Sequence, residues 1–135
     1  MRLALIMSFK FAEYTIADYE VFWVGKLTFG FVNLRPITRH HLLVCPIRIV
    51  PRFIDLQPDE LSEMTSVSSL IAQKVHNGRS NLAIQDGPEA GQTVSHVHVH
   101  IIPADAPLQV DSRGPDRTPQ DMQEEADLIR SLLES

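Results

Sequence analysis

Apolar and polar residues recur with two different periods along this chain, and the periods predict its secondary structure. The stretch EVFWVGKLTFGFVNL (20–34) is rich in aromatic and β-branched residues and predicts a β-hairpin that turns at Gly25 and Lys26. Further strands are expected at the apolar runs HLLVCPI, NLAIQDG and HVHVHII, which occupy residues 41–47, 81–87 and 96–102.

A helical period appears twice. The segment PDELSEMTSVSSLIAQKVHNG (58–78) has a proline and two acidic residues in its first turn and an Asn-Gly stop at its end, which predicts a helix. A final helix is expected over 119–134, where Thr118 can cap the amino end ahead of Pro119. Because strands and helices do not alternate regularly, the pattern predicts an α+β fold with a mainly antiparallel sheet.

The length of 135 residues suits one compact domain, and we therefore expect residues 1–135 to form a single unit. Within it, residues 1–6 precede a second methionine, Met7, and are expected to be an optional N-terminal extension. The polar, proline-rich segment 104–118 is expected to be a mobile loop.

Composition narrows the classes of function. The net charge of −5 argues against a nucleic-acid partner, since such proteins display a basic face. No apolar run reaches the roughly 18 residues that a membrane span needs, so no membrane partner is expected. The single cysteine, Cys45, cannot form an intramolecular disulfide, which fits a reducing compartment. We expect a cytoplasmic protein, with nuclear presence left open.

Three of the six histidines lie in one short run, SHVHVHIIP (95–103). Side chains at positions i, i+2 and i+4 share one face of a strand, so His96, His98 and His100 are expected to point to the same side. The valines between them would then point into the core. Such a row of imidazoles can line a groove.

Three interpretations of this row compete. Imidazoles are good zinc ligands, but the nearby carboxylates form no familiar chelating motif. A neutral imidazole can instead attack phosphorus and carry the transferred group. The third interpretation is a surface strand that has histidine by chance. The loop DGPEAGQTVS (86–95), just ahead of the row, offers backbone N–H groups and polar side chains to an anion. We therefore favour a hydrolase of nucleotides or phosphate esters.

A family resemblance supports this interpretation. HVHVHIIP matches the pattern His-φ-His-φ-His-φ-φ, with φ apolar, of the histidine-triad family of nucleotide hydrolases and transferases. MSFKF, VNLRPI, HLLVCPIRIVPRF, DLQPDE and QDGPEAGQTVSHVHVHIIP resemble more specifically the fragile-histidine-triad branch, the dinucleoside polyphosphate hydrolases. The resemblance covers residues 7–103 in order and the last helix more loosely.

The resemblance implies a five-stranded antiparallel sheet with two main helices, and a homodimer in which two sheets join. It also implies cleavage of diadenosine triphosphate, or a related dinucleoside polyphosphate, into AMP and the other nucleotide. No cofactor is expected to be tightly bound. A divalent cation, Mg²⁺ or Mn²⁺, is expected to enter with the substrate.

The resemblance further implies roles for individual residues. His98 would be the nucleophile that carries AMP covalently, and His100 would contact the phosphate. His96 and His41 would orient and support the pocket, and Asn33 would bind the ribose. The expected polyphosphate contacts are Gln85, Gly91, Gln92, Thr93 and Val94.

Structural explanations stay open for three of these residues. Asn33 lies just before Arg35 and Pro36 and can cap a turn. Gln85 can make a purely structural hydrogen bond, and His41 can be a buried histidine whose hydrogen bonds are satisfied.

The sequence departs from the branch in places. His40 stands where the branch usually has glycine, so the backbone of this turn can differ. Tyr14 stands where the branch has a histidine, which leaves its contact with nucleotide open. Segment 104–118 lacks the tyrosine-bearing insert of the branch. His40 and His76 are expected at the surface.

Two rival functions remain open. The phosphoramidase branch of the same family cleaves AMP–amine conjugates, but Gln85 and Gln92 favour polyphosphate. The other rival is a nucleotide sensor, in which the complex with dinucleotide is the signal and slow turnover ends it.

Overall fold

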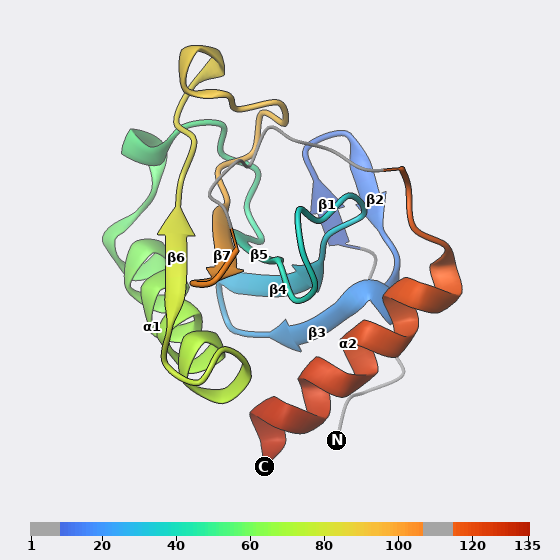
Figure 1. Ribbon diagram of the computed structural model, residues 1–135. Coiled ribbons are helices and arrows are strands. Elements are labelled where there is room, and N and C mark those ends of the chain that lie inside the picture. The colour runs from blue at the N-terminus through green and yellow to red at the C-terminus, as the bar shows by residue number, and fades with distance from the viewer. Residues whose placement is uncertain (1–8, 107–114) are drawn as a thin grey trace.

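A five-stranded antiparallel sheet and two long helices make up most of the protein (Figure 1). The computed structural model describes residues 9–106 and 115–135. The strands follow the order β3-β4-β5-β7-β6, and the predicted α+β class and antiparallel sheet are confirmed. The sheet strands are β3 (Val21–Val24), β4 (Thr28–Val32), β5 (Leu42–Pro46), β6 (Ser80–Ala83) and β7 (Val99–Pro103), and the helices are α1 (Pro58–Val75) and α2 (Pro119–Glu134).

The predicted hairpin is formed by β3 and β4. The Gly25 N–H donates to the Thr28 carbonyl at 2.8 Å, which closes the turn. Glu63 of α1 accepts a hydrogen bond from the Leu27 N–H at 3.0 Å, so the helix holds the turn. Gly30 of β4 faces Phe22, and a Cβ at Gly30 would lie 2.8 Å from that ring. A larger residue at this position would therefore displace the aromatic side chain.

Both predicted helices are present, and their ends follow the local chemistry. Thr118 Oγ1 accepts from the Asp121 N–H at 3.1 Å, which confirms the expected N-cap. The first helix ends three residues earlier than predicted, at Val75. Asn77 and Gly78 both have positive φ, and the Gly78 N–H donates to the Ala72 carbonyl at 2.7 Å, which terminates the helix.

Two predicted strands have different limits in the structure. The ladder of β7 begins at Val99, so His96 and His98 precede it. The reason is a tight turn, in which the His96 N–H donates to the Val94 carbonyl at 2.8 Å. The chain is nevertheless held beside residue 50, because the Val97 N–H donates to the Val50 carbonyl at 2.8 Å. Strand β6 covers only residues 80–83, since the chain then leaves the sheet for the glycine-rich loop.

One small sheet was not predicted. β1 (Phe9–Phe11) and β2 (Tyr14–Ile16) form a hairpin, with Ala12 at a φ of 52° in its turn. Strands of three residues are too short to show an alternation, and the turn has no glycine, so local pattern gave no signal.

The two faces of the main sheet are covered differently. Both helices pack on one face, where Val99 and Ile101 meet Met64 of α1 and Ile129 of α2 in one core cluster. The β1–β2 hairpin covers the other face with a second cluster that includes Phe29. Figure 1 shows this hairpin on the side of the sheet away from α1. The expected inward orientation is thereby confirmed for Val99, which faces the helices from β7. Val97 is also buried, but it precedes the strand.

Ile101 offers a direct test of this core. It is fully buried on β7, and Ile101→Ala is expected to lower the free energy of unfolding by about 2–4 kcal/mol, because the neighbouring helices cannot close the cavity. Ile54, which is 83% exposed, provides a matched control, and Ile54→Ala is expected to cost less than about 0.5 kcal/mol. Urea unfolding measures both, and equal losses would contradict the assignment of this core.

The expectation that His40 and His76 lie at the surface is wrong. His76 is buried, with its two ring nitrogens 2.6 Å from Ser80 Oγ and 2.8 Å from the His40 carbonyl. His40 is partly buried and contacts Glu125 of α2. Its φ of 65° is in the left-handed region that favours glycine. The chain therefore keeps a glycine-type backbone at position 40 although it has a side chain there.

Other expectations are only partly covered by the described residues. The proposed extension 1–6 lies outside them, as do residues 107–114 of the predicted loop. At the ends of that loop, residues 104–106 and 115–118 form no helix or strand. Neither described helix combines the length and the apolar character needed to cross a bilayer.

Candidate active site

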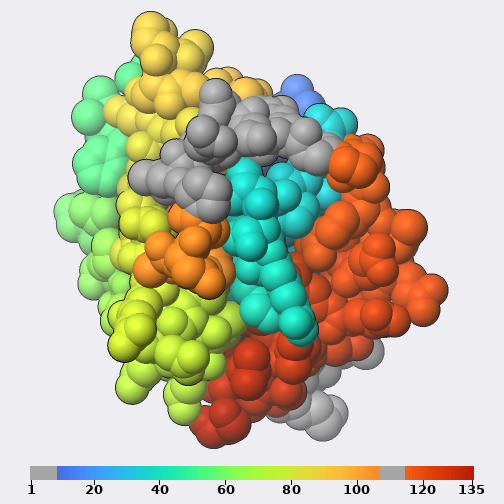
Figure 2. Space-filling view, viewed as in Figure 1, coloured from blue at the N-terminus to red at the C-terminus, as the bar shows by residue number. Residues whose placement is uncertain are grey.

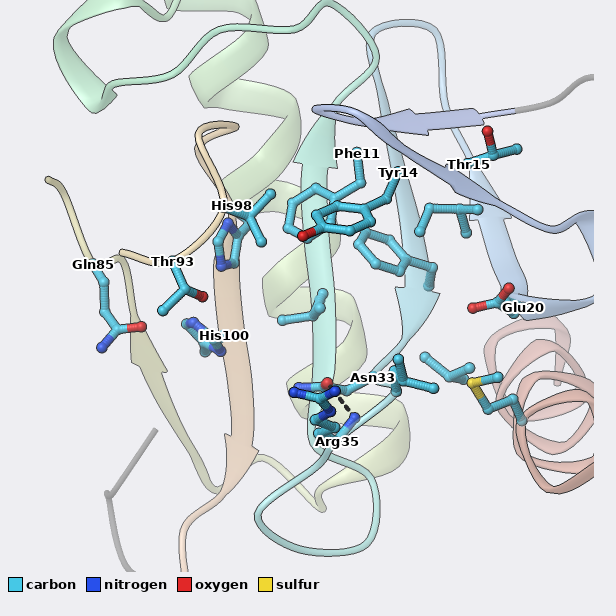
Figure 3. A pocket seen from close by; sticks show the side chains of 17 residues that line it. Phe11, Tyr14, Thr15, Glu20, Asn33, Arg35, Gln85, Thr93, His98 and His100 are labelled. Atoms are coloured by element: carbon cyan, nitrogen blue, oxygen red, sulfur yellow. Dashed lines mark hydrogen bonds between the residues drawn. The ribbon is translucent and has the colours of Figure 1, made fainter. Parts of the chain in front are cut away.

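Two residues of the histidine row, His98 and His100, face a pocket of about 370 Å³ on the hairpin side of the sheet (Figure 3). Its lining includes His98 and His100, together with Phe11 from β1 and Phe31 from β4. Figure 3 shows Gln85, Thr93 and the two histidines grouped at one end of the pocket, with Glu20 at the other. Of the sequence-predicted site residues, the structure places these in the lining: Asn33, Gln85, Thr93, Val94, His98 and His100.

The ring of His98 has a defined tautomer. Its Nδ1 lies 2.7 Å from the backbone carbonyl of His96, which can only accept a hydrogen bond. Nδ1 therefore carries the proton, and the lone pair of the neutral ring is on Nε2. Burial lowers the pKa of His98 to about 4, so the ring is neutral at pH 7. Phe11 packs edge-on against it, with ring centroids 4.9 Å apart. His98 thus has an unprotonated Nε2 on a ring whose orientation is fixed.

His96 differs from its neighbours, because it does not line the pocket. Its Nδ1 accepts from the Ala12 N–H at 2.9 Å, so Nε2 carries the proton and donates to the Pro46 carbonyl at 2.8 Å. The side chain is fully buried and joins the β1–β2 turn to the end of β5. Burial also lowers its pKa. His96 therefore anchors the hairpin that covers the pocket.

His41 sets the tautomer of His100. The Ile37 N–H donates to His41 Nδ1 at 3.1 Å, which leaves the proton of His41 on Nε2. This Nε2–H points to His100 Nδ1 at 2.9 Å, so His100 accepts there and carries its own proton on Nε2. Burial lowers the pKa of His41 to about 4, which keeps it neutral. The pocket is thereby lined by one ring with a lone pair on Nε2 and one ring with an Nε2–H donor.

Within the glycine-rich loop, the two glutamines have different positions. Gln85 lines the pocket and packs over Gly91, which has a φ of 94°. Gln92 is outside the lining. Its Oε1 accepts from the Gly87 N–H at 2.7 Å, and its Nε2 donates to the carbonyls of Pro51 and Val94 at 2.8 and 2.9 Å. The Gln92 amide therefore holds the shape of the loop.

Asn33 both caps a turn and lines the pocket. It follows the last residue of β4, and its Oδ1 accepts from the Arg35 N–H at 2.9 Å. Its backbone carbonyl accepts two hydrogen bonds from the Arg117 guanidinium, at 3.2 and 2.6 Å. The turn-capping alternative and the pocket position are thus both true of this residue.

Several lining residues were not found from the sequence. The β1–β2 hairpin, the turn that follows it, strands β4 and β5, and α2 bring them to the pocket from distant parts of the chain. Among them, only Tyr14 was indicated by the sequence, because it stands where the family branch has a histidine. These unpredicted lining residues include Phe11, Ile16, Glu20, Phe31, Leu43 and Met122.

The tautomers bear on the zinc interpretation. Three imidazoles can bind one metal ion only if each directs a lone pair to it. Both nitrogens of His96 already have backbone partners, and neither faces the pocket. Over the described ranges 9–106 and 115–135, no three His, Cys, Asp or Glu side chains form a group able to hold a metal ion.

Sequence comparison identifies the fold family. The model of the HIT domain, the histidine-triad domain, matches residues 16–106. The chain belongs to this family. It is 41% identical to the bifunctional bis(5'-adenosyl)-triphosphatase/adenylylsulfatase of Arabidopsis thaliana, over 94% of this chain and 85% of the relative. It is 35% identical to the bis(5'-adenosyl)-triphosphatase of Dictyostelium discoideum, over 92% of each.

A solved structure of the same family is also similar. Diadenosine triphosphate hydrolase of Plasmodium falciparum, in complex with cyclomarin A, superimposes with a TM-score of 0.82 and is 31% identical in sequence. The match covers 99% of this chain and 89% of that one. The expected resemblance to the histidine-triad family, and within it to proteins named as dinucleoside polyphosphate hydrolases, is therefore confirmed.

Proposed function

We propose that this protein hydrolyses dinucleoside polyphosphates, with diadenosine triphosphate as the preferred class member, to AMP and ADP. The observation that carries the proposal is the tautomer of His98, a buried neutral ring with its Nε2 lone pair in the pocket lining. The names of the relatives supply the substrate class.

In the first step, His98 Nε2 attacks the α-phosphorus. The N–P bond forms and the bond from phosphorus to the bridging oxygen breaks, so that ADP leaves with the electron pair. The ring becomes positively charged, and its Nδ1–H bond to the His96 carbonyl stabilises that charge. The Nε2–H of His100 donates to a non-bridging phosphate oxygen, where negative charge is held in the transition state.

In the second step, water attacks the same phosphorus. The P–N bond breaks, its electron pair returns to Nε2, AMP leaves and the proton of the water passes to solvent. Thr93, Val94 and Gln85 border the polyphosphate, while Gln92 and Gly91 maintain the loop. Asn33 binds the ribose. A divalent cation enters with the polyphosphate and neutralises part of its charge.

A substrate panel tests this function. Diadenosine triphosphate, diadenosine tetraphosphate, adenylyl sulfate and AMP phosphoramidate are incubated with the protein in ¹⁸O-labelled water and excess Mg²⁺. AMP and ADP from the triphosphate, with the label in AMP, support the proposal. Cleavage of the phosphoramidate alone would assign the phosphoramidase function instead. Tight binding of dinucleotide without turnover would assign the sensor function.

Gly91 tests the position of Gln85. A Cβ at Gly91 would lie 2.5 Å from Gln85 Nε2, and the φ of 94° strains any other residue. Gly91→Ala is therefore expected to displace Gln85 from the pocket and to lower kcat/KM about ten-fold. Gly78 is a matched control, because it has a φ of 78° and a Cβ added there would meet nothing within 4 Å. Gly78→Ala is expected to lower the free energy of unfolding by a similar amount and to leave kcat/KM unchanged. An equal loss of kcat/KM in both variants would refute the role of Gln85.

We also propose that two copies form a homodimer through β6. This strand is at the edge of the sheet and pairs only with β7 within the described part of the chain. Leu82 on it is 55% exposed, and a groove between α1 and β6 includes the small residues Ser69 and Ala72. An open edge and an apolar side chain suit pairing with a second copy. Leu82→Lys is expected to convert the dimer to a monomer in sedimentation velocity, and a monomeric wild type would overturn the proposal.

The domain organisation and the cellular compartment are also proposals. Residues 1–135 are proposed to work as a single HIT domain. Cys45 is buried and is not in a disulfide, which suits the proposed cytoplasmic location.

A further inference from the structure

The turn between β4 and β5 carries a predicted site residue at each end. Asn33 follows Val32, the last residue of β4, and His41 precedes Leu42, the first residue of β5. Both residues are therefore just outside the strands, where the hydrogen bonds of the sheet no longer hold the backbone. Contacts from outside the sheet must therefore fix the positions of Asn33 and His41.

Helix α2 supplies that support through one carboxylate. Glu125 Oε1 accepts from Arg117 at 2.8 Å, and Arg117 in turn donates to the Asn33 carbonyl. Glu125 Oε2 accepts from both the backbone N–H and the ring Nδ1 of His40, each at 3.0 Å. His40 is bonded directly to His41. One side chain thus holds both ends of the turn.

The electrostatics favour a charged Glu125 at neutral pH. Its side chain is only 8% exposed. Burial by itself raises its pKa, but the hydrogen bonds from His40 and Arg117 reverse this effect and leave the pKa below its ordinary value. A buried carboxylate with three donors is a rigid junction. Figure 2 shows the turn, in teal, packed directly against α2, in red.

We propose that Glu125 is a positioning residue for the proposed hydrolysis. It acts through Arg117 on Asn33, which is proposed to bind the ribose, and through His40 on His41, which sets the tautomer of His100. The inference rests on the proposed function. It predicts that a residue of the last helix, absent from the pocket lining, affects both substrate binding and turnover.

The chain contains a matched control for this residue. Glu60, at the start of α1, is also buried, and it accepts two hydrogen bonds from Arg48, at 2.7 and 3.0 Å, and one from the Gln57 N–H, at 2.8 Å. Neither Glu60 nor Arg48 lines the active-site pocket. Glu125→Gln and Glu60→Gln therefore remove the same charge from similar surroundings, and only one of them is connected to the site.

The test combines kinetics with thermal unfolding and AMP binding. Both variants are expected to lower the melting temperature. Only Glu125→Gln is expected to raise KM, lower kcat and reduce kcat/KM by about 10- to 100-fold, because both ends of the turn shift. Arg117→Lys loses the forked contact at the Asn33 end alone. It is expected to raise KM and to weaken AMP binding while kcat changes little, and it replaces Glu125→Gln if that variant fails to fold.

The outcomes separate the two proposals. If Glu125→Gln and Arg117→Lys both match Glu60→Gln in kinetics and differ only in melting temperature, the positioning role is wrong. If the wild type hydrolyses no member of the substrate panel, the proposed function fails. AMP binding, measured by calorimetry, then still reports whether Glu125 and Arg117 position Asn33.

Discussion

Replacement of His98 by asparagine is expected to abolish hydrolysis of diadenosine triphosphate while AMP still binds. The asparagine amide can donate to the His96 carbonyl, as Nδ1–H does, but it has no nucleophilic nitrogen at the position of Nε2. Loss of a nucleophile costs turnover about four orders of magnitude or more. The other lining residues, including Asn33 and Thr93, are expected to keep their positions and to bind AMP.

The experiment has a covalent readout in addition to the rate. Wild-type protein, quenched during turnover in alkaline denaturant because acid hydrolyses the P–N bond, is expected to carry an AMP adduct on the peptide that contains His98. The adduct is absent from His98→Asn. An unchanged rate in the variant, or an adduct located on His100 or His96, would show that the nucleophile has been assigned to the wrong ring. Calorimetry with AMP and a thermal melt establish that the variant is folded.

Stability is expected to fall as the pH is lowered from neutrality. His41 and His98 each have a pKa of about 4 in the folded protein, lowered by burial from 6.5. Between these values the unfolded chain binds more protons than the folded chain, so the free energy of unfolding decreases as the pH falls through this window. At about pH 5 the loss is on the order of 2 kcal/mol for each histidine.

Urea unfolding at about pH 7.5 and about pH 5 measures this effect. His98→Asn removes one of the two rings with a pKa of about 4 and is expected to reduce the loss at about pH 5 by on the order of 2 kcal/mol. His41 accounts for part of the dependence that remains, together with His76 and His96, whose pKa values burial also lowers. The ion-paired carboxylates Glu60 and Glu125 act in a different range, because their pKa values are lowered from 4.5 and their contribution is lost only as the pH falls below that value. Constant stability between the two pH values would mean that the histidines are protonated as readily in the folded as in the unfolded chain.

Local sequence was sufficient where a few neighbouring residues decide the conformation. Thr118 caps α2, and the Asn-Gly pair at 77–78 ends α1, because these side chains and backbones act within one turn. The β3–β4 hairpin follows from its aromatic and β-branched residues for the same reason. The β1–β2 hairpin was not predicted, because its stability comes from aromatic contacts with β4, about twenty positions later in the chain. Phe9 packs on Phe29, and Phe11 packs on Phe31.

Six of the ten site residues expected from sequence and resemblance line the pocket, but the expectations treated residues by type. Gln85 and Gln92 were both expected to contact phosphate. Only Gln85 lines the pocket, because the Gln92 side chain makes its three hydrogen bonds within and beside the loop. His40 and His76 were expected at the surface, since nothing near them in the sequence indicates a buried partner. The contact between His76 and the His40 carbonyl spans 36 positions, and the contact between His40 and Glu125 spans 85.

The amino-acid sequence alone determines the family and the order in which the main strands and helices follow one another along the chain. It also determines the side of the sheet on which His98 and His100 lie. Alternation in a strand is a local property, so it needs no tertiary information. The nitrogen that carries the proton in each ring, in contrast, depends on the folded chain. That choice is made by the backbone groups of Ala12, Ile37, Pro46 and His96 that meet the imidazoles, and only folding brings most of these groups to the rings. The three histidines look alike in the sequence, and their partners give each one a different chemistry.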